Sequence, residues 1–92
     1  HVADVSVNAE TGFVSVNKIY VAHDCGRAIN PLLVLGQIEG SSYMGAAEVF
    51  LENYIIDEQE GARKGMPLGT SLLDYRTPTT LDTPDIEAMI VE

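Results

Sequence analysis

Two groups of residues in this chain have side chains that could take part in chemistry or bind a ligand. The first is the run His-Asp-Cys at positions 23–25, which combines an imidazole, a carboxylate and a thiol. The second is Gln37, which lies between Gly36 and Gly40 in an otherwise aliphatic stretch. The first group has the side chains of a metal or nucleophile site. The second has the features of a helix surface against which a ligand can lie.

For the run at 23–25, structural roles are favoured over a catalytic or metal-binding one. Consecutive residues on an extended chain point in opposite directions, so three in a row seldom converge on one metal ion. A cysteine–histidine nucleophile pair usually comes from distant segments. We therefore expect Asp24 to cap the loop, Cys25 to pack as a small apolar residue, and Gly26 to adopt an unusual backbone angle. A single cysteine also provides too few ligands for a zinc or iron–sulfur site.

Gln37 leaves two interpretations open. Small residues one helical turn apart allow another backbone or a flat ligand to come close, and the glutamine amide supplies both a donor and an acceptor. A buried amide without partners costs about 1–3 kcal/mol, so a buried Gln37 should have a partner. On the residues alone, the favoured interpretation is a partly exposed helix glutamine, or a core glutamine satisfied by backbone groups. Ligand binding is the alternative.

The remaining polar residues are interpreted as structural. Glu39 lies two positions from Gln37 and points elsewhere on a helix, so we expect an ion pair or hydrogen bond, with Arg27 or Arg76, rather than proton transfer. The acids at 57, 58 and 60 form a solvated charge run, because a calcium loop needs oxygen ligands at regular spacing. Residues 74–76 and the following threonines and prolines are expected to hold the last strand in place.

Alternation of apolar and polar residues predicts an antiparallel hairpin over residues 1–22, with a half-buried first strand at 1–8. Its turn at 8–12 ends in Gly12, which can take a positive φ. In the second strand the alternation slips by one near Asn17 and Lys18, and a β-bulge would account for that slip.

The best helix candidate covers residues 31–51. Asn30 can cap the first free N–H groups, and Pro31 suits the first helical position. One helix face carries Leu33, Gln37, Gly40, Met44, Ala47 and Leu51. Three glycines would destabilise an isolated helix by roughly 1 kcal/mol each, which predicts tight packing on the glycine face.

The rest of the chain is expected to contain a short strand at 53–57, a polar mobile loop at 58–69, an extended unpaired stretch at 75–84 and a last strand at 86–91. The order β-β-α-β-β predicts an α+β fold in which one long helix packs on a small, mainly antiparallel sheet.

Composition limits the classes of function. The chain has 92 residues, of which 46% are hydrophobic, so it forms one globular domain or less. Five basic against fourteen acidic residues give a net charge of −9, which argues against nucleic acid as a partner. No run approaches the ~20 apolar residues of a membrane span. The single cysteine fits a reducing compartment, and we expect a cytoplasmic protein. The start at His1, without an initiator methionine, is typical of a piece of something longer.

Two motifs carry a resemblance to a known family. His-Asp-Cys-Gly-Arg-Ala-Ile-Asn-Pro at 23–31 and Gly-Gln-Ile-Glu-Gly at 36–40 resemble the large, molybdopterin-binding subunit of the molybdenum hydroxylases. This is the family of xanthine dehydrogenase and aldehyde oxidoreductase. The likeness extends to Ala-Asp-Val-Ser-Val at 3–7, Glu-Thr-Gly at 10–12, Ser-Leu-Leu-Asp-Tyr-Arg-Thr-Pro at 71–78 and Asp-Thr-Pro-Asp-Ile-Glu at 82–87. It is collinear over nearly all of the chain but covers a small part of the family's large subunit.

The resemblance implies an oxidoreductase that hydroxylates heteroaromatic or aldehyde substrates with oxygen derived from water. It implies molybdopterin as the cofactor, with Gln37, Gly36 and Gly40 against it, and the metal held by the dithiolene rather than by Cys25. It also implies iron–sulfur clusters, and in some members FAD, on other domains or subunits. The family's general base is a glutamate in a Gly-Val-Gly-Glu motif, which this sequence lacks, so no catalytic residue is assigned.

Residues 1–92 are therefore interpreted as a single segment of the C-terminal region of a molybdopterin-binding domain, inactive and free of cofactor when isolated. Its expected partners are the remaining large-subunit domains and the iron–sulfur and flavin domains or subunits. A homodimer through the exposed apolar surface is also considered. Two alternatives remain: a freestanding interaction module without cofactor, and a structural dimerisation piece that uses the glycine face of the helix.

Overall fold

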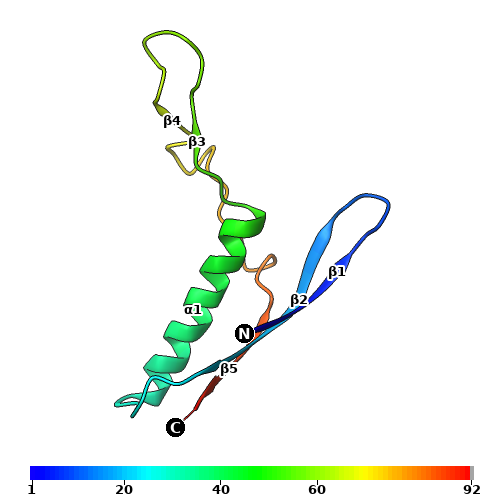
Figure 1. Cartoon of the computed structure of the whole chain (residues 1–92), viewed down its shortest axis with the longest axis vertical. Coiled ribbons are helices and arrows are strands. Elements are labelled where there is room, and N and C mark those ends of the chain that lie inside the picture. The colour runs from blue at the N-terminus through cyan, green and yellow to red at the C-terminus, as the bar shows by residue number, and fades with distance from the viewer. Residues whose placement is uncertain (92) are drawn as a thin grey trace.

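The computed structural model describes residues 1–91 and contains a long helix and five strands in two sheets. The elements are β1 (Val2–Val7), β2 (Val14–His23), α1 (Pro31–Phe50), β3 (Ile55–Ile56), β4 (Pro67–Leu68) and β5 (Asp85–Ile90). Figure 1 shows α1 beside the three-stranded sheet of β1, β2 and β5, with the β3–β4 pair beyond the C-terminal end of the helix. The predicted α+β class is confirmed.

Strands β1 and β2 form the predicted antiparallel hairpin. The register pairs Asp4 with Lys18 but Val5 with Val16, so Asn17 is the extra residue of a bulge at the predicted place. At the turn, the Asn8 side chain accepts hydrogen bonds from the backbone of residues 10 and 11, and Gly12 has a φ of 73°. The hairpin is therefore determined by local signals.

The pairing of β5 with β2 is parallel, which makes the sheet mixed, with strand order β1-β2-β5. Parallel neighbours need a long crossover, commonly a helix, and α1 supplies it here. Val21 lies opposite Ala88 and Ile19 opposite Ile86. These side chains share a sheet face, and α1 packs on that face, chiefly over β5.

Helix α1 begins as predicted. The Asn30 Oδ1 accepts a hydrogen bond from the backbone N–H of Leu33 at 3.2 Å, and Pro31 occupies the first turn. The face turned to the sheet differs from the predicted stripe. Of the predicted stripe, Ala47 is buried and Leu51 is half-buried, but Leu33 and Met44 are 66% and 58% exposed. Ile38, which lies outside that stripe, is buried instead. Apolar residues occur on several sides of the helix, so the spacing of apolar residues along the sequence does not by itself identify the side that is buried.

The predicted tight packing at the helix glycines is not found within residues 1–91. A Cβ atom added at Gly36, Gly40 or Gly45 would meet nothing within 4 Å. The predicted half-burial of β1 is also wrong. Every residue of β1 is exposed, because the helix packs over β5, at the opposite edge of the sheet.

Beyond the helix, β3 confirms the short strand expected near residue 55, although it has only two residues. Its antiparallel partner β4 lies inside the stretch predicted to be a loop. Residues 75–84 contain no strand, as predicted, and β5 begins directly after them.

The chain is extended and has a very small core. Its radius of gyration is 17.5 Å, whereas a compact chain of this length would have about 12 Å. Among residues 1–91, only Val21, Ile38 and Ala47 are buried. Large apolar side chains remain open to solvent, Ile29 at 99% and Leu73 at 96% exposure. Surface of this kind normally meets another domain or chain.

Candidate functional site

A cavity of about 680 Å³ lies between the loop after β2 and the N-terminal half of α1. Its polar lining includes His23, Cys25 and Arg27 from the strand end and loop, together with Gln37 and Ser41 from the helix. Val21, Val34 and Ile38 are among the apolar residues of its wall. The volume is within the range of small-molecule and cofactor sites.

Local structure explains why these residues meet. Val21 and His23 are two apart in a strand and so point to the same face. The Asp24 Oδ1 then accepts a hydrogen bond from the Gly26 N–H at 2.8 Å, and Gly26 has a φ of 67°. This turn directs the chain toward the start of the helix. Gln37 and Ser41 are four residues apart on α1 and therefore lie on one face of it.

The cavity differs in charge from the rest of the molecule. The chain carries fourteen acidic residues, yet within the described part none of them lines this cavity. Arg27 lines it and forms no ion pair with any of residues 1–91. Lys18 and Lys64 are paired with carboxylates, whereas Arg63 and Arg76 are unpaired among the described residues but lie outside this cavity.

The run at 23–25 is only partly as predicted. Asp24 caps the turn and Gly26 takes the left-handed conformation, which confirms both expectations. Cys25 is exposed rather than packed, so that prediction is wrong. Its thiol lies 3.6 Å from the carbonyl oxygen of Gly26. No cluster of three or more His, Cys, Asp or Glu side chains suited to a metal ion occurs within residues 1–91.

Of the three residues predicted to bind cofactor, Gln37 lines the cavity, whereas Gly36 and Gly40 do not. Gln37 is exposed, so it needs no partner within the chain. The ion pair expected for Glu39 with Arg27 or Arg76 is not formed among the described residues. Sequence reasoning missed His23 and Arg27 as cavity residues, because nothing in the spacing shows that the loop folds back toward the helix.

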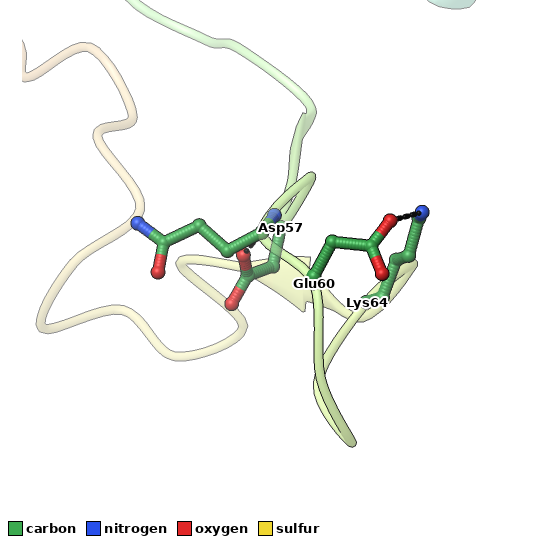
Figure 2. A network of polar contacts seen from close by, with 4 residues as sticks. Asp57, Glu60 and Lys64 are labelled. Atoms are coloured by element: carbon green, nitrogen blue, oxygen red, sulfur yellow. Dashed lines mark hydrogen bonds and ion pairs between the residues drawn. The ribbon is translucent and has the colours of Figure 1, made fainter.

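The acidic run near residue 58 has local roles. Figure 2 shows Glu60 beside Lys64, joined by an ion pair of 2.6 Å, with Asp57 nearby. The Asp57 Oδ1 accepts a hydrogen bond from the Gln59 N–H at 3.0 Å, which shapes the turn between β3 and β4. These contacts agree with the interpretation of a solvated charge run.

Two further cavities involve side chains that are already engaged. The Tyr43 hydroxyl, in a cavity of about 520 Å³, donates to the Pro78 carbonyl at 2.9 Å. The Tyr75 hydroxyl, in a cavity of about 320 Å³, donates to the Glu52 carboxylate at 3.0 Å, and this bond raises the pKa of Tyr75. The two bonds tie the segment after β4 to the C-terminal half of α1 and to the residues just after the helix. Neither leaves a free reactive group.

On the sheet face away from the helix, the Lys18 ammonium lies 2.8 Å from Glu87 and 3.2 Å from Asp85, over the ring of Tyr20. The hydrogen bond to Glu87, followed by that to Asp85, raises the pKa of Lys18. The register places Lys18 opposite Asp85, so the cluster links β2 to β5. The sequence does not indicate this cluster, because the residues of β5 do not reveal that the strand pairs with β2 in parallel.

A helix that presents a glutamine to an acid-free cavity, above a small mixed sheet, defines a unit suited to binding a polar ligand. The chain belongs to the molybdopterin cofactor-binding domain family, whose model matches residues 1–84. The predicted relationship to the large subunits of molybdenum hydroxylases is thereby confirmed, and the cofactor of the family is molybdopterin.

Several proteins that are named for different substrates contain a segment similar to this chain. The xanthine dehydrogenase molybdenum-binding subunit of Escherichia coli is 38% identical over 97% of the chain. The nicotine 6-hydroxylase large subunit of Paenarthrobacter nicotinovorans is 38% identical over 100% of it. The carbon monoxide dehydrogenase large chain of Hydrogenophaga pseudoflava is 36% identical over 90%. The chain spans only 10% to 11% of the length of these relatives.

Solved structures agree with the fold. Quinoline 2-oxidoreductase from Pseudomonas putida superposes with a TM-score of 0.77 at 38% identity, over 98% of this chain and 11% of that one. Carbon monoxide dehydrogenase from Oligotropha carboxidovorans gives a TM-score of 0.78 at 30% identity, over 92% of this chain and 10% of that one. The extended form of the chain is thus the form of this segment inside larger enzymes.

The residues present fit part of a molybdopterin site. The pterin carries ring nitrogens that donate and accept hydrogen bonds, and the Gln37 amide can do both. It also carries an anionic phosphate, which would meet no carboxylate of residues 1–91 in this cavity and to which Arg27 would offer a guanidinium. The open space at Gly36 and Gly40 leaves the helix surface next to Gln37 accessible.

Proposed function

We propose that the chain is a segment of the C-terminal region of the molybdopterin-binding domain in a molybdenum hydroxylase large subunit. In this proposal the loop after β2 and the N-terminal half of α1 form one wall of the cofactor site. The observation that carries the proposal is the position of Gln37, which lines a cavity with no acidic residue of residues 1–91 in its wall and lies between Gly36 and Gly40, where the space beside the helix is open.

Molybdopterin, when bound, supplies the molybdenum centre at which a heteroaromatic or aldehyde substrate is oxidised with oxygen from water. This chain's contribution is binding and orientation. The Gln37 amide donates to and accepts from the pterin, with Gly36 and Gly40 allowing its approach. Asp24 and Asn30 hold the two ends of the loop through their hydrogen bonds to backbone N–H groups. The metal needs no ligand from Cys25.

The range of substrates among the relatives supports a role at the cofactor. They are named for xanthine, nicotine, carbon monoxide and quinoline, yet they share this segment at 30% to 38% identity. A segment that fixed the substrate would have to differ in chemistry between such enzymes. The molybdenum cofactor is what they have in common, and a wall of its site is the simplest shared role.

Electron transfer to iron–sulfur clusters, and in some members to FAD, belongs to other domains or subunits in this proposal. Relatives described as large subunits support that organisation. The remaining large-subunit domains are the proposed partners of the exposed apolar side chains of α1 and of residues 72–81. A cytoplasmic location stays a prediction. The described residues include no helix that is long and apolar enough to cross a membrane.

The test is the cofactor content of the native polypeptide that carries this sequence. Purified from its natural source, it should contain molybdenum by mass spectrometry and a fluorescent pterin after oxidation, each near one per polypeptide. A native polypeptide that is stably folded and contains neither would contradict the proposal. That result would favour the alternative of a freestanding or dimerising module without cofactor.

A further inference from the structure

The basic residues of the chain differ in whether they are paired with carboxylates and in whether they line the cavity that contains Gln37. The chain has five basic residues. Lys18 is held by Asp85 and Glu87, and Lys64 is held by Glu60. Arg27 makes no such pair among residues 1–91, and it is the basic side chain other than histidine that lines the cavity. Arg63 and Arg76 are likewise without an ion pair among residues 1–91, but neither of them lines this cavity. Its position at the cavity therefore distinguishes Arg27 from the other arginines.

The surroundings of Arg27 favour an anion. The first turn of α1 contains no acidic residue, so the positive end of the helix dipole near Asn30 is not compensated by a side chain. His23 lines the same cavity, and its imidazole can provide a further N–H donor. Guanidinium groups bind phosphate through two parallel hydrogen bonds, which are roughly twice as strong as neutral ones. These features match a phosphate better than a neutral ring.

The loop also fixes the backbone of Arg27 without using its side chain. On one side, the Asp24 carboxylate accepts from Gly26 N–H at 2.8 Å. On the other side, Asn30 caps the helix through Leu33 N–H at 3.2 Å. Arg27 lies between these two fixed points, and its exposed side chain is free to reorient toward a ligand.

We propose that Arg27 binds the anionic phosphate group of the pterin cofactor at the loop end of the cavity, while Gln37 contacts the pterin from the helix. This inference rests on the proposed function and adds to it a specific binding residue for a specific part of the cofactor. Arg27 acts by charge and hydrogen bonding and takes no part in the reaction at the metal.

The experiment uses the full-length holoenzyme and three variants: Arg27→Gln, Arg27→Lys and, as the matched control, Arg63→Gln in the loop between β3 and β4. Molybdenum and pterin are quantified per polypeptide, and the rate of pterin release is followed at increasing concentrations of sodium phosphate. Losing a charge-assisted hydrogen bond should raise the release rate of Arg27→Gln roughly ten- to hundredfold. Arg63→Gln should behave as wild type, and Arg27→Lys should fall between.

The outcomes separate this inference from the proposed function. A wild-type enzyme without pterin overturns both. A wild-type enzyme with pterin, combined with equal release rates for Arg27→Gln and Arg63→Gln, overturns the role of Arg27 alone. If Arg27→Lys retains pterin no better than Arg27→Gln, positive charge is not the cause and the inference also fails. Melting temperatures of the cofactor-free variants should match, because the Arg27 side chain makes no ion pair with residues 1–91 that folding would lose.

Discussion

Replacement of Gln37 gives the sharpest test of the helix as a cofactor wall. Gln37 is exposed and lines the cavity, so Gln37→Ala removes little that holds this chain together. Any loss should therefore come from the cofactor. One or two hydrogen bonds to the pterin contribute on the order of 1–3 kcal/mol, which corresponds to a roughly ten- to hundredfold weaker retention or slower turnover.

Gln37→Glu should have a larger effect than its similar shape suggests. The described part of the chain places no carboxylate in this cavity, and the cofactor brings its own phosphate and metal–oxo groups. A new negative charge would be repelled by them and would be costly to desolvate. The expected order of cofactor retention is wild type, then Gln37→Ala, then Gln37→Glu.

The assay compares molybdenum content, steady-state kinetics and melting temperature in the full-length enzyme. The matched control is Gln59→Ala, which truncates the chain's other glutamine, in the β3–β4 loop. Cys25→Ser serves as a second control, because Cys25 is not assigned to the metal. If Gln37→Ala equals wild type while Cys25→Ser loses molybdenum, the reasoning is refuted, and the loop rather than the helix holds the cofactor.

Three other outcomes are expected. The isolated 92 residues should bind no molybdenum and show no hydroxylase turnover, because one wall makes few of the cofactor's contacts; stoichiometric metal by mass spectrometry would overturn this. The isolated chain should self-associate or melt at low temperature, because only Val21, Ile38 and Ala47 of the described residues are buried. A monomer by sedimentation, together with a sharp thermal melt that does not depend on concentration, would contradict this. The backbone N–H and hydroxyl of Thr79 donate to Asp82 and lower the pKa of that carboxyl. Its contribution to stability is therefore present above the ordinary aspartate pKa and lost as pH falls through the lowered one, and a carboxyl NMR titration should give Asp82 a pKa below the ordinary aspartate value.

The parts of the fold that were predicted correctly depend on local signals. The slip in alternation located the bulge at Asn17, because side chains in a strand alternate strictly. Asn30 and Pro31 located the start of the helix, because capping uses only neighbouring residues. The parallel direction of β5 was not predicted, since alternation within a strand carries no information about its neighbour. The cluster of Lys18 with Asp85 was missed for the same reason.

The candidate site was predictable only in part. The resemblance identified Gln37, and the structure brings that residue to a cavity. The position of Arg27 and His23 beside it depends on the turn at Gly26, which folds the loop toward the helix. The contact between this loop and the helix depends on the three-dimensional fold, so the spacing of residues along the chain does not reveal it. The buried helix face was predicted only in part: Ala47 of the predicted stripe is buried, but packing on β5 buries Ile38 and leaves Leu33 exposed.

The helix glycines connect the fold to the proposed function. Gly36 and Gly40 each cost the helix roughly 1 kcal/mol relative to alanine, and no contact among the described residues requires them to lack a Cβ. Their cost must then be offset by something that approaches the open side of α1. They flank Gln37, whereas the buried Ile38 faces the sheet. A flat ligand against the Gln37 side accounts for the two glycines and the free amide together, and burial against a second copy of the chain would account for the glycines alone.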